Sequence, residues 1–453
     1  MQMKIGPLDI FKHLPKKNCG DCGEETCMAF SLRIIDRELK IGDCPWLAIE
    51  QKMVLEELTA PSVHLVSFGQ PSLSFGGEDT MYRHELTFFC QTAIAIEVHD
   101  EMKETELLSR VKFTNTYSIE RMGKEQTLQA LAIRCRSHDP EIFADCVRSV
   151  TERYHMPLIY CSMDPDVLKA GLETNNEKPL LYAATEQNWK QLAELAQEYS
   201  CPLVVFADNN IAELQEVIES IRNAGIEEIA ADPGTHPENP RITLSSFIRL
   251  RESAVKGNNF FHCPLVGITT ASSDAITEAL IASMMVVRYA DLLILKAPQT
   301  EVLLPILTLR KDIYTDPRRR VAVDPGLRIF GNPTKDSPVL STTNFALTYY
   351  TVTGDIESSH LDCYLLVFDS DGIGVESAVA GGQLDAFKAK DAMERVNLES
   401  IVDHRIIIIP GLAARIKSDL ERISSWKVLV GPKDSSEIPK FIKRVWNKGI
   451  HDE

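Results

Sequence analysis

The chain has 453 residues, of which 44% are apolar and 25% charged, and its net charge is −17. These proportions are ordinary for a soluble globular protein, and the length predicts about three domains. The negative charge argues against nucleic acid or membrane as the main partner, because both present phosphate groups that an acidic surface repels.

The N-terminal residues contain no apolar stretch followed by a small-residue cleavage site, so no secretory signal is expected. The most apolar long stretch, Pro264–Val287, is interrupted by Asp274 and Glu278 and is not expected to span a membrane. We therefore expect a cytoplasmic protein, in which disulfides do not persist. Clustered cysteines are then expected to bind metal, and dispersed ones to be small buried apolar side chains.

Four of the eleven cysteines lie within the first 44 residues, at Cys19, Cys22, Cys27 and Cys44. Their spacing, C-x2-C-x4-C-x16-C, places three thiolates on one loop and the fourth beyond a predicted amphipathic helix over residues 28–40. Gly20 and Gly23 follow two of the cysteines and allow backbone N–H groups to turn toward the sulfurs. This pattern favours a 4Fe–4S cluster that carries electrons, since no iron is left open. A structural zinc site and a disulfide framework are the alternatives.

From about residue 60 onward, short apolar runs alternate with amphipathic, helix-like stretches. The runs are Ala93–Val98, Leu128–Ile133, Pro157–Tyr160, Pro202–Phe206, Glu228–Ala231, Pro264–Gly267 and Asp291–Leu295. Alternating strands and helices imply parallel strands, and about 250 residues of them suit a (β/α)8 barrel. Before the barrel, the segments Ser74–Glu78 and Arg83–Glu85 are expected to belong to a hairpin.

Polar residues directly follow several of these predicted strands. They are Ser162, Asp164, Asp208, Asn209, Asp232, Thr269 and Thr270. They would lie at the carboxyl-terminal rim of the barrel, where barrel enzymes place their chemistry. The alternative is that Asp208, Asn209 and Asp232 cap helices and form turns. No familiar catalytic motif accompanies them, so no independent catalytic centre is expected.

The segment Asp312–Arg320 is charged and contains a proline, and we interpret it as a linker. Beyond it, the sequence predicts a small Rossmann-like α/β domain with strands over Phe345–Val352, Cys363–Phe368, Gly374–Val379, Arg405–Ile409 and Trp426–Val430. Each ends in a small or polar loop, and glycine loops at one sheet edge allow a large flat or phosphate-bearing ligand to approach. No G-x-G-x-x-G motif indicates a dinucleotide, and ordinary tight turns are the alternative explanation of the glycines.

These segments together resemble one known family over essentially the whole chain. The most specific matches are Asn18–Phe30 with Cys44-Pro45, Gly76–Glu78 with Arg83–Glu85, Thr343–Thr348, and Pro410–Ala414. They resemble the large (gamma) subunit of the corrinoid iron–sulfur protein of the acetyl-CoA decarbonylase/synthase system. The resemblance implies a 4Fe–4S domain over residues 1–59, a TIM-like (β/α)8 barrel over 60–312 and a corrinoid-binding domain over 313–453.

Carried over by position, the resemblance assigns two sets of cofactor-binding residues. The cluster ligands would be Cys19, Cys22, Cys27 and Cys44. The corrinoid would lie over Thr343, Asn344, Thr348, Gly372, Ile373, Gly374, Val375 and Gly431. The usual corrinoid signature D-x-H-x-x-G is absent, because His404 has no following glycine pattern. Without a protein nitrogen on the cobalt, Co(I) should form more easily.

The function implied by the resemblance is that of a methyl carrier in a corrinoid-dependent methyltransferase system. A separate methyltransferase would transfer a methyl group from methyltetrahydrofolate or methyltetrahydropterin, giving methyl-Co(III). The methyl group would pass to acetyl-CoA synthase in the reductive acetyl-CoA pathway, and the 4Fe–4S cluster would return Co(II) to Co(I). The implied partners are the small (delta) subunit, forming a heterodimer, the methyltransferase, acetyl-CoA synthase and a reductive activator.

Two other functions remain open from the sequence. In one, the barrel binds a methylpterin through Asp208, Asn209 and Asp232, and the chain is itself a pterin-dependent methyltransferase. In the other, the chain is a non-catalytic Fe–S electron carrier or scaffold.

Overall fold

The computed structural model describes residues 5–85, 87–121, 124–257, 261–296, 298–317 and 320–446. The chain forms two compact units, one of residues 1–119 with 126–315 and the other of 120–125 with 316–453. The three-domain division expected from the sequence stays a prediction. In the expected linker, helix α11 (Thr300–Ile313) continues to Ile313, whereas Arg318 and Arg319 lie outside the described residues.

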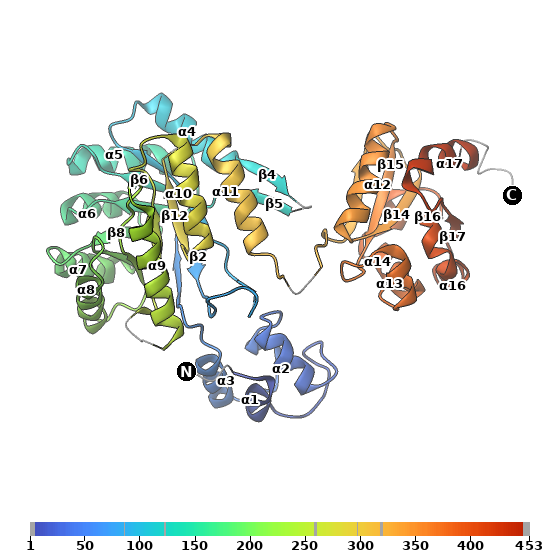
Figure 1. The fold of residues 1–453 in the computed structure, drawn as a ribbon, viewed down its shortest axis with the longest axis horizontal. Coiled ribbons are helices and arrows are strands. Elements are labelled where there is room, and N and C mark those ends of the chain that lie inside the picture. Colours follow the sequence, from blue (N-terminus) through green and yellow to red (C-terminus); the bar gives the residue numbers. More distant parts are fainter. Residues whose placement is uncertain are drawn as a thin grey trace. The chain divides into compact units, whose positions relative to one another are not determined.

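The chain begins with a small helical region (Figure 1). It contains α1 (Pro7–His13), α2 (Cys27–Ile35), η1 (Ile41–Asp43) and α3 (Ile49–Leu58). Its core consists of Ile10, Leu14, Phe30, Ile34 and Leu55. Helix α2 is shorter than the predicted 28–40, because Arg37 has a positive φ of 54° that helical backbone does not allow.

Eight parallel strands form the predicted barrel. They are β3 (Ala93–His99), β6 (Ala130–Arg134), β7 (Leu158–Cys161), β8 (Leu180–Ala184), β9 (Leu203–Phe206), β10 (Ile229–Asp232), β11 (Val266–Ile268) and β12 (Leu292–Leu295). The sheet order is β10-β9-β8-β7-β6-β3-β12-β11, and a parallel bridge between Ala231 and Leu265 joins its two edges. The expected TIM-like barrel is therefore confirmed.

A helix follows each barrel strand and packs outside the barrel (Figure 1). In chain order these are α4 (Glu104–Thr116), α5 (Pro140–Thr151), α6 (Pro165–Thr174), α7 (Trp189–Tyr199), α8 (Ile211–Asn223), α9 (Pro240–Val255), α10 (Ala275–Val287) and α11. The buried faces of these helices and the outward side chains of the strands share the largest hydrophobic cluster of the described chain. The alternation read from the sequence thus corresponds to strands covered by helices.

A β-hairpin closes the amino-terminal end of the barrel. Strands β1 (Leu65–Phe68) and β2 (Leu73–Gly76) pair in antiparallel fashion, so the expected hairpin for Ser74–Glu78 is confirmed as far as Gly76. The same expectation for Arg83–Glu85 is wrong, because this segment forms a turn outside the hairpin. Side chains of the hairpin, among them Phe68 and Phe75, pack with the inward-facing residues of the barrel strands. The backbone N–H of Gly69 donates to Lys178 O (2.8 Å), just before β8. The hairpin therefore covers the amino-terminal end of the barrel, opposite the carboxyl-terminal rim.

The second unit contains a five-stranded mixed sheet. Its strands are β13 (Gly326–Phe330), β14 (Val339–Thr343), β15 (Cys363–Phe368), β16 (Ile406–Ile409) and β17 (Lys427–Val430), in the order β13-β15-β14-β16-β17. Only β13 is antiparallel to its neighbour among these described strands. Strand β14 lies between β15 and β16 and precedes both in the chain. The connection from β14 to β15 and the connection from β15 to β16 therefore run in opposite directions, which makes the position of β14 a topological switch point.

Helices cover both faces of this sheet. Helices α12 (Ala346–Ser358) and α17 (Ile438–Val445) share one hydrophobic cluster with the strands. The other face is covered by α13 (Val375–Ala380), α14 (Ala386–Arg395), α15 (Leu398–Ile401) and α16 (Lys417–Ser424). Each face therefore has a core of its own.

Two predicted strands of this unit are wrong. Phe345–Val352 belongs mostly to helix α12, and Gly374–Val379 belongs mostly to helix α13. The first segment is rich in aromatic and β-branched residues, which favour strands locally. The buried residues of α12, however, are Ala346, Tyr349, Thr353 and Ile356, which lie three or four residues apart. This helical spacing extends beyond the end of the predicted strand at Val352.

The remaining two-stranded sheet pairs β4 (Ser118–Arg121) with β5 (Lys124–Thr127). Across the described ranges, none of the helices combines the length and the apolar character needed to cross a membrane.

Candidate functional site

The four clustered cysteines surround one small pocket. Cys27 is the first residue of α2, whose N-cap Thr26 accepts a hydrogen bond from Ala29 N (3.1 Å). Cys44 directly follows η1. The pocket is lined by Leu14, Pro15, Lys17, Asn18, Cys19, Gly20, Cys22, Glu24, Cys27, Phe30, Cys44 and Trp46. The structure therefore brings together all four predicted ligands.

The loop between the ligands is shaped by glycine and by one asparagine. Gly20 and Gly23 have φ of 82° and 88°, as the sequence suggested. The side chain of Asn18 accepts a hydrogen bond from Cys27 N (2.9 Å). Asn18 directly precedes Cys19, so this bond fixes Cys27 relative to Cys19. The sequence alone does not show this role of Asn18.

The thiols are free and close enough to influence one another. The eleven cysteines all lie in described ranges and none forms a disulfide. Burial raises the pKa of the Cys44 thiol, and negative charge on Cys22, Cys27 and Cys19 raises this pKa further. Within the described residues, no group of three or more His, Cys, Asp or Glu is placed to hold a single metal ion. Four thiolates around one pocket fit a multi-iron cluster, whose irons separate the sulfurs more widely than one ion does.

The residues expected to bind the corrinoid gather at the carboxyl edge of the five-stranded sheet. Thr343 ends β14, Gly372–Val375 follow β15 and Gly431 follows β17. A Cβ atom on Gly374 would lie 4.0 Å from Thr348 Oγ1, so the loop after β15 lies beside α12. In parallel α/β sheets, ligands bind at this edge, beside the switch point.

Asn344 has a structural task in this edge. Its buried Oδ1 accepts hydrogen bonds from Ser370 N (3.0 Å), Ser370 Oγ (2.8 Å) and Gly372 N (3.1 Å). Its Nδ2 donates to Asp369 Oδ1 (3.0 Å). Asn344 therefore fixes the loop after β15, and only one N–H of its amide is left for a ligand.

The same edge offers features that suit a large, flat, mainly apolar cofactor. The hydroxyl of Thr343 is buried and has no hydrogen-bond partner. Leu347 at the start of α12 and Leu412 just after β16 are large apolar side chains that remain exposed. An unpaired hydroxyl and exposed apolar groups at one sheet edge fit a macrocycle with peripheral polar groups.

The loop Pro410–Ala414 after β16 completes this edge and was not among the predicted contact residues. A Cβ atom on Gly411 would lie 2.8 Å from Gly431 O, so the loops after β16 and β17 touch at this glycine. The sequence offered one sign of this role, since Pro410–Ala414 is among the segments that carry the family resemblance. The strand order then shows that this loop lies next to the switch point at β14, because β16 is the neighbour of β14.

His404 lies at the opposite edge of the sheet, just before β16. Its Nε2 is 2.9 Å from Ser337 O, and its Nδ1 accepts a hydrogen bond from Ile406 N (3.2 Å). Both ring nitrogens are therefore engaged by backbone groups. His360 likewise precedes a strand, β15. Neither described histidine of this unit reaches the carboxyl edge.

Three of the polar residues expected at the rim of the barrel, Asp208, Asn209 and Asp232, lie close together. Asn209 N donates to Pro233 O (2.9 Å), and His236 Nε2 lies 2.9 Å from Asp208 Oδ1. The capping alternative holds in part, since Asp232 Oδ1 accepts the turn N–H of Gly234 (2.8 Å). Asp232 also accepts a hydrogen bond from Tyr182 OH (3.0 Å). Burial raises the pKa of the Asp232 carboxyl to about 6.

Sequence reasoning missed a buried ion pair in the same end of the barrel. Arg134 on β6 donates to Glu97 on β3 (2.6 Å), and Arg136 donates to the other carboxylate oxygen (3.0 Å). The guanidinium of Arg134 also lies 5.9 Å from the ring centre of Tyr182. The sequence carries little signal for this pair, because Glu97 and Arg134 each lie at the end of an apolar run.

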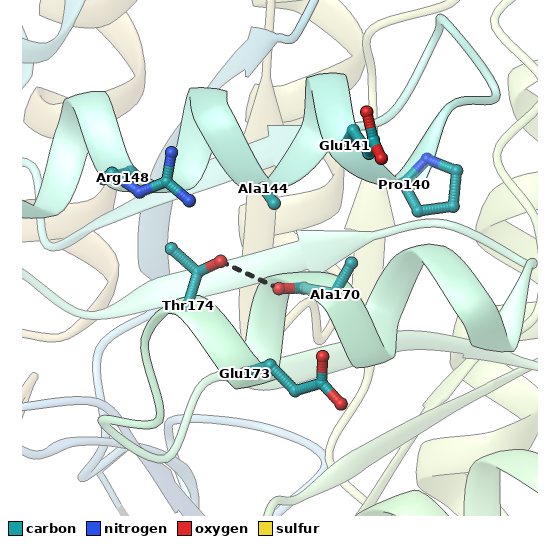
Figure 2. Close-up of a pocket in the computed structure, with 7 residues that line it drawn as sticks. All are labelled: Pro140, Glu141, Ala144, Arg148, Ala170, Glu173 and Thr174. Atoms are coloured by element: carbon teal, nitrogen blue, oxygen red, sulfur yellow. Dashed lines mark hydrogen bonds between the residues drawn. The ribbon is translucent and has the colours of Figure 1, made fainter.

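A separate hollow lies on the outside of the barrel between α5 and α6 (Figure 2). It is lined by Pro140, Glu141, Ala144, Arg148, Ala170, Glu173 and Thr174. The hydroxyl of Thr174 donates to Ala170 O (2.9 Å) within its own helix. The charged side chains belong to exposed helix surfaces and do not converge on one point in the figure, so we assign this hollow no chemistry.

Comparison with known proteins covers nearly the whole chain. The family model CdhD, described as "CO dehydrogenase/acetyl-CoA synthase delta subunit", matches residues 65–442, and the model FeS, described as "Putative Fe-S cluster", matches residues 14–46. The second range contains all four clustered cysteines.

Curated relatives are named as one subunit of a complex. "Acetyl-CoA decarbonylase/synthase complex subunit gamma" from Methanosarcina acetivorans is 44% identical, with 98% of this chain and 99% of the relative covered. The subunit of the same name from Archaeoglobus fulgidus is 39% identical over the same shares. Among solved structures, dihydropteroate synthase from Thermus thermophilus covers 56% of this chain and is itself covered completely, at 12% identity and a TM-score of 0.41.

Identity near 40% over the full length of both chains is enough to establish common descent. The chain belongs to the family of the acetyl-CoA decarbonylase/synthase complex subunit gamma, the large subunit of the corrinoid iron–sulfur protein.

Proposed function

We propose that this chain is a methyl carrier that holds a corrinoid and a 4Fe–4S cluster and passes methyl groups to acetyl-CoA synthase. The observation that carries the proposal is the full-length match to gamma subunits, together with four cysteines around one pocket inside the matched Fe–S range. The methyl donor would be a methyltetrahydrofolate or methyltetrahydropterin, used by a separate methyltransferase. The small (delta) subunit and a reductive activator would be further partners, and the cytoplasm the place of action.

The cluster ligands in this proposal are Cys19, Cys22, Cys27 and Cys44. The pocket core of Leu14 and Phe30 would keep water from the inner side of the cluster. When bound, the cluster would supply single electrons that keep the cobalt in its reactive state.

The corrinoid would lie over the carboxyl edge of the five-stranded, Rossmann-like sheet. Thr343, Asn344, Thr348, Ile373 and Val375 are the proposed side-chain contacts, and Gly372, Gly374 and Gly431 allow close approach. The positions of His360 and His404 at the other edge support a corrinoid that takes no ligand from the described histidines of this unit. When bound, the corrinoid would supply the methyl-accepting chemistry, and the protein would supply position and access.

An anaerobic visible spectrum, recorded before and after a low-potential reductant, tests this proposal. We expect a Co(I) corrinoid band after reduction and about four iron atoms per chain. The absence of cobalt, with iron still present, would contradict the carrier function and favour an Fe–S electron carrier or scaffold.

A second candidate function has one observation in its favour. Asp208, Asn209 and Asp232 lie together at the carboxyl-terminal end of the barrel, where a methylpterin could bind. Titration with methyltetrahydrofolate or its methanogen counterpart, with and without a separate methyltransferase, separates the two functions. Methylation of the corrinoid by this chain alone would show a methyltransferase; methylation only with the added enzyme would show a carrier.

A further inference from the structure

Lys17 and Trp46, two side chains outside the ligand set, line the cysteine pocket, and Trp46 contacts both Lys17 and Asp21. Trp46, two residues after Cys44, donates from its Nε1 to Asp21 Oδ2 (2.6 Å). The ammonium group of Lys17 lies 3.6 Å from the centre of the Trp46 ring. Lys17 and Asp21 come from the first ligand loop, whereas Trp46 follows the fourth ligand. The contacts therefore connect the two ends of the ligand motif without using any thiolate.

The two sides of the pocket differ in their surroundings. Leu14 and Phe30 are 3% and 1% exposed and form the inner wall. Trp46 also lines the pocket but is 50% exposed, so it lies between the pocket and solvent. The N–H and one ring face of this indole both have a protein partner, which holds the ring in one position.

We propose that Lys17, Asp21 and Trp46 form a clasp over the solvent side of the 4Fe–4S pocket, and that the clasp sets the reduction potential of the cluster. The inference rests on the proposed function, since it requires the cluster. Water access and nearby charge are two of the properties that determine the potential of an iron–sulfur cluster. The indole limits water access, and Lys17 contributes a positive charge that favours the reduced cluster.

Two substitutions separate these contributions because they act in opposite directions. Trp46→Ala opens the pocket to water, which stabilises the more negative, reduced cluster and shifts the potential upward. Lys17→Met keeps an apolar stem but removes the charge, which shifts the potential downward. Trp46→Phe keeps a ring under Lys17 and loses the bond to Asp21, so its shift should be smaller than that of Trp46→Ala.

The test is an anaerobic redox titration of the full chain, followed by the electron paramagnetic resonance signal of the reduced cluster. Bleaching of the visible iron–sulfur absorption in air provides a second measurement, and Trp46→Ala should bleach several-fold faster than wild type. Lys169→Met is the matched control: it removes the same charge from an exposed lysine of α6, whose partner is Glu173 (3.9 Å). Its potential and bleaching rate should equal those of wild type.

Iron and sulfide analysis distinguishes the two possible failures. If purified wild-type protein binds no cluster, the proposed function fails. If the cluster is present but Trp46→Ala and Lys17→Met titrate and bleach like wild type, the clasp fails and the proposed function stands. Should Trp46→Ala not retain iron, Trp46→Phe and Lys17→Met decide the question by the same measurements, and wild-type values for both would overturn the clasp.

Discussion

The buried carboxyl group of Glu78 makes the stability of this chain depend on pH. Glu78, from the Gly76–Glu78 segment noted in the sequence, is 1% exposed and accepts hydrogen bonds from Phe89 N (2.8 Å) and Cys90 N (2.7 Å). Its other carboxylate oxygen has no hydrogen-bond partner. Burial raises the pKa of Glu78 from 4.5 to about 7, although the charge of Arg251 acts in the opposite direction.

The raised pKa of Glu78 predicts a loss of stability with increasing pH. Between pH 4.5 and 7 the folded chain keeps a proton that the unfolded chain releases, so this contribution is present below the unfolded pKa and is lost as pH rises through 7. Glu78→Gln should remove this loss, which amounts to up to about 3 kcal/mol between pH 5 and 8. Urea unfolding of wild type and variant at both pH values checks this. Parallel pH dependences of the two proteins would contradict the prediction.

Asn344 gives a second prediction at the residue scale. Asn344→Ala leaves the buried backbone N–H groups of Ser370 and Gly372 without their acceptor, whereas Ser370 Oγ still donates to Ile373 O (2.8 Å). The loss should cost about 3 kcal/mol in unfolding free energy. The loop 369–374 should exchange its amide hydrogens faster, and less cobalt should copurify. Asn332→Ala, the same change at an exposed asparagine of this unit, is the control and should be near neutral. Unchanged exchange in Asn344→Ala would show that the loop holds its shape without this side chain.

At the scale of elements, the sequence predicted secondary structure best where apolar runs and amphipathic stretches alternate over many residues. It predicted secondary structure worst where a short segment has a strong local preference for one structure. The barrel strands and the alternation with helices could be predicted, because strands buried on both faces read as apolar runs. Phe345–Val352 was wrongly predicted to be a strand because it is rich in aromatic and β-branched residues. The true central strand, β14, is the short segment Val339–Thr343, in which three of the five residues are polar. The four thiolates were predictable from spacing, whereas Trp46 was not, because its partners Lys17 and Asp21 are distant in the chain.

Two glycines at the carboxyl edge predict different consequences for the loops that they occupy. A Cβ on Gly411 would lie 2.8 Å from backbone atoms of Gly431, Pro432 and Lys433, so Gly411→Ala should destabilise the unit by about 1–3 kcal/mol. A Cβ on Gly374 would have its nearest neighbour at 3.5 Å, an ordinary contact. Gly374→Ala should therefore keep the stability of wild type and bind less corrinoid.

Thermal unfolding of apo protein and cobalt analysis of holo protein check these two effects separately. An unfolding temperature of Gly411→Ala equal to that of wild type would show that the loops after β16 and β17 can separate without cost. Full cobalt content in Gly374→Ala would place the corrinoid away from this loop.

At the scale of the whole molecule, the chain consists of two units that each have their own hydrophobic cores. The second unit has one core on each face of its sheet. Its size, about 140 residues, is typical of a domain that folds independently.

We therefore expect residues 316–453 to fold as a separate fragment. The fragment should show a single cooperative transition in circular dichroism and should bind added corrinoid. A fragment that begins at residue 345 lacks β13 and the central strand β14 and should not fold, which makes it the matched control. A non-cooperative transition of the longer fragment would indicate that residues 120–125, which cluster with this unit, are needed as well.

The hairpin that closes the barrel also determines how far the electron-carrying region can travel. Ser62 N donates to Asp79 Oδ1 (2.7 Å) and His64 N to His262 O (2.7 Å), so the chain is attached to the barrel from Ser62 onward. Only four peptide steps separate Ser62 from the end of α3 at Leu58, and they span at most about 14 Å. Arg37, which follows α2, forms an ion pair with Asp79. Even if this ion pair opens, the small helical region remains on a short tether. A cluster bound by the proposed ligands would therefore exchange electrons close to the amino-terminal end of the barrel, and an acceptor would have to come to that place.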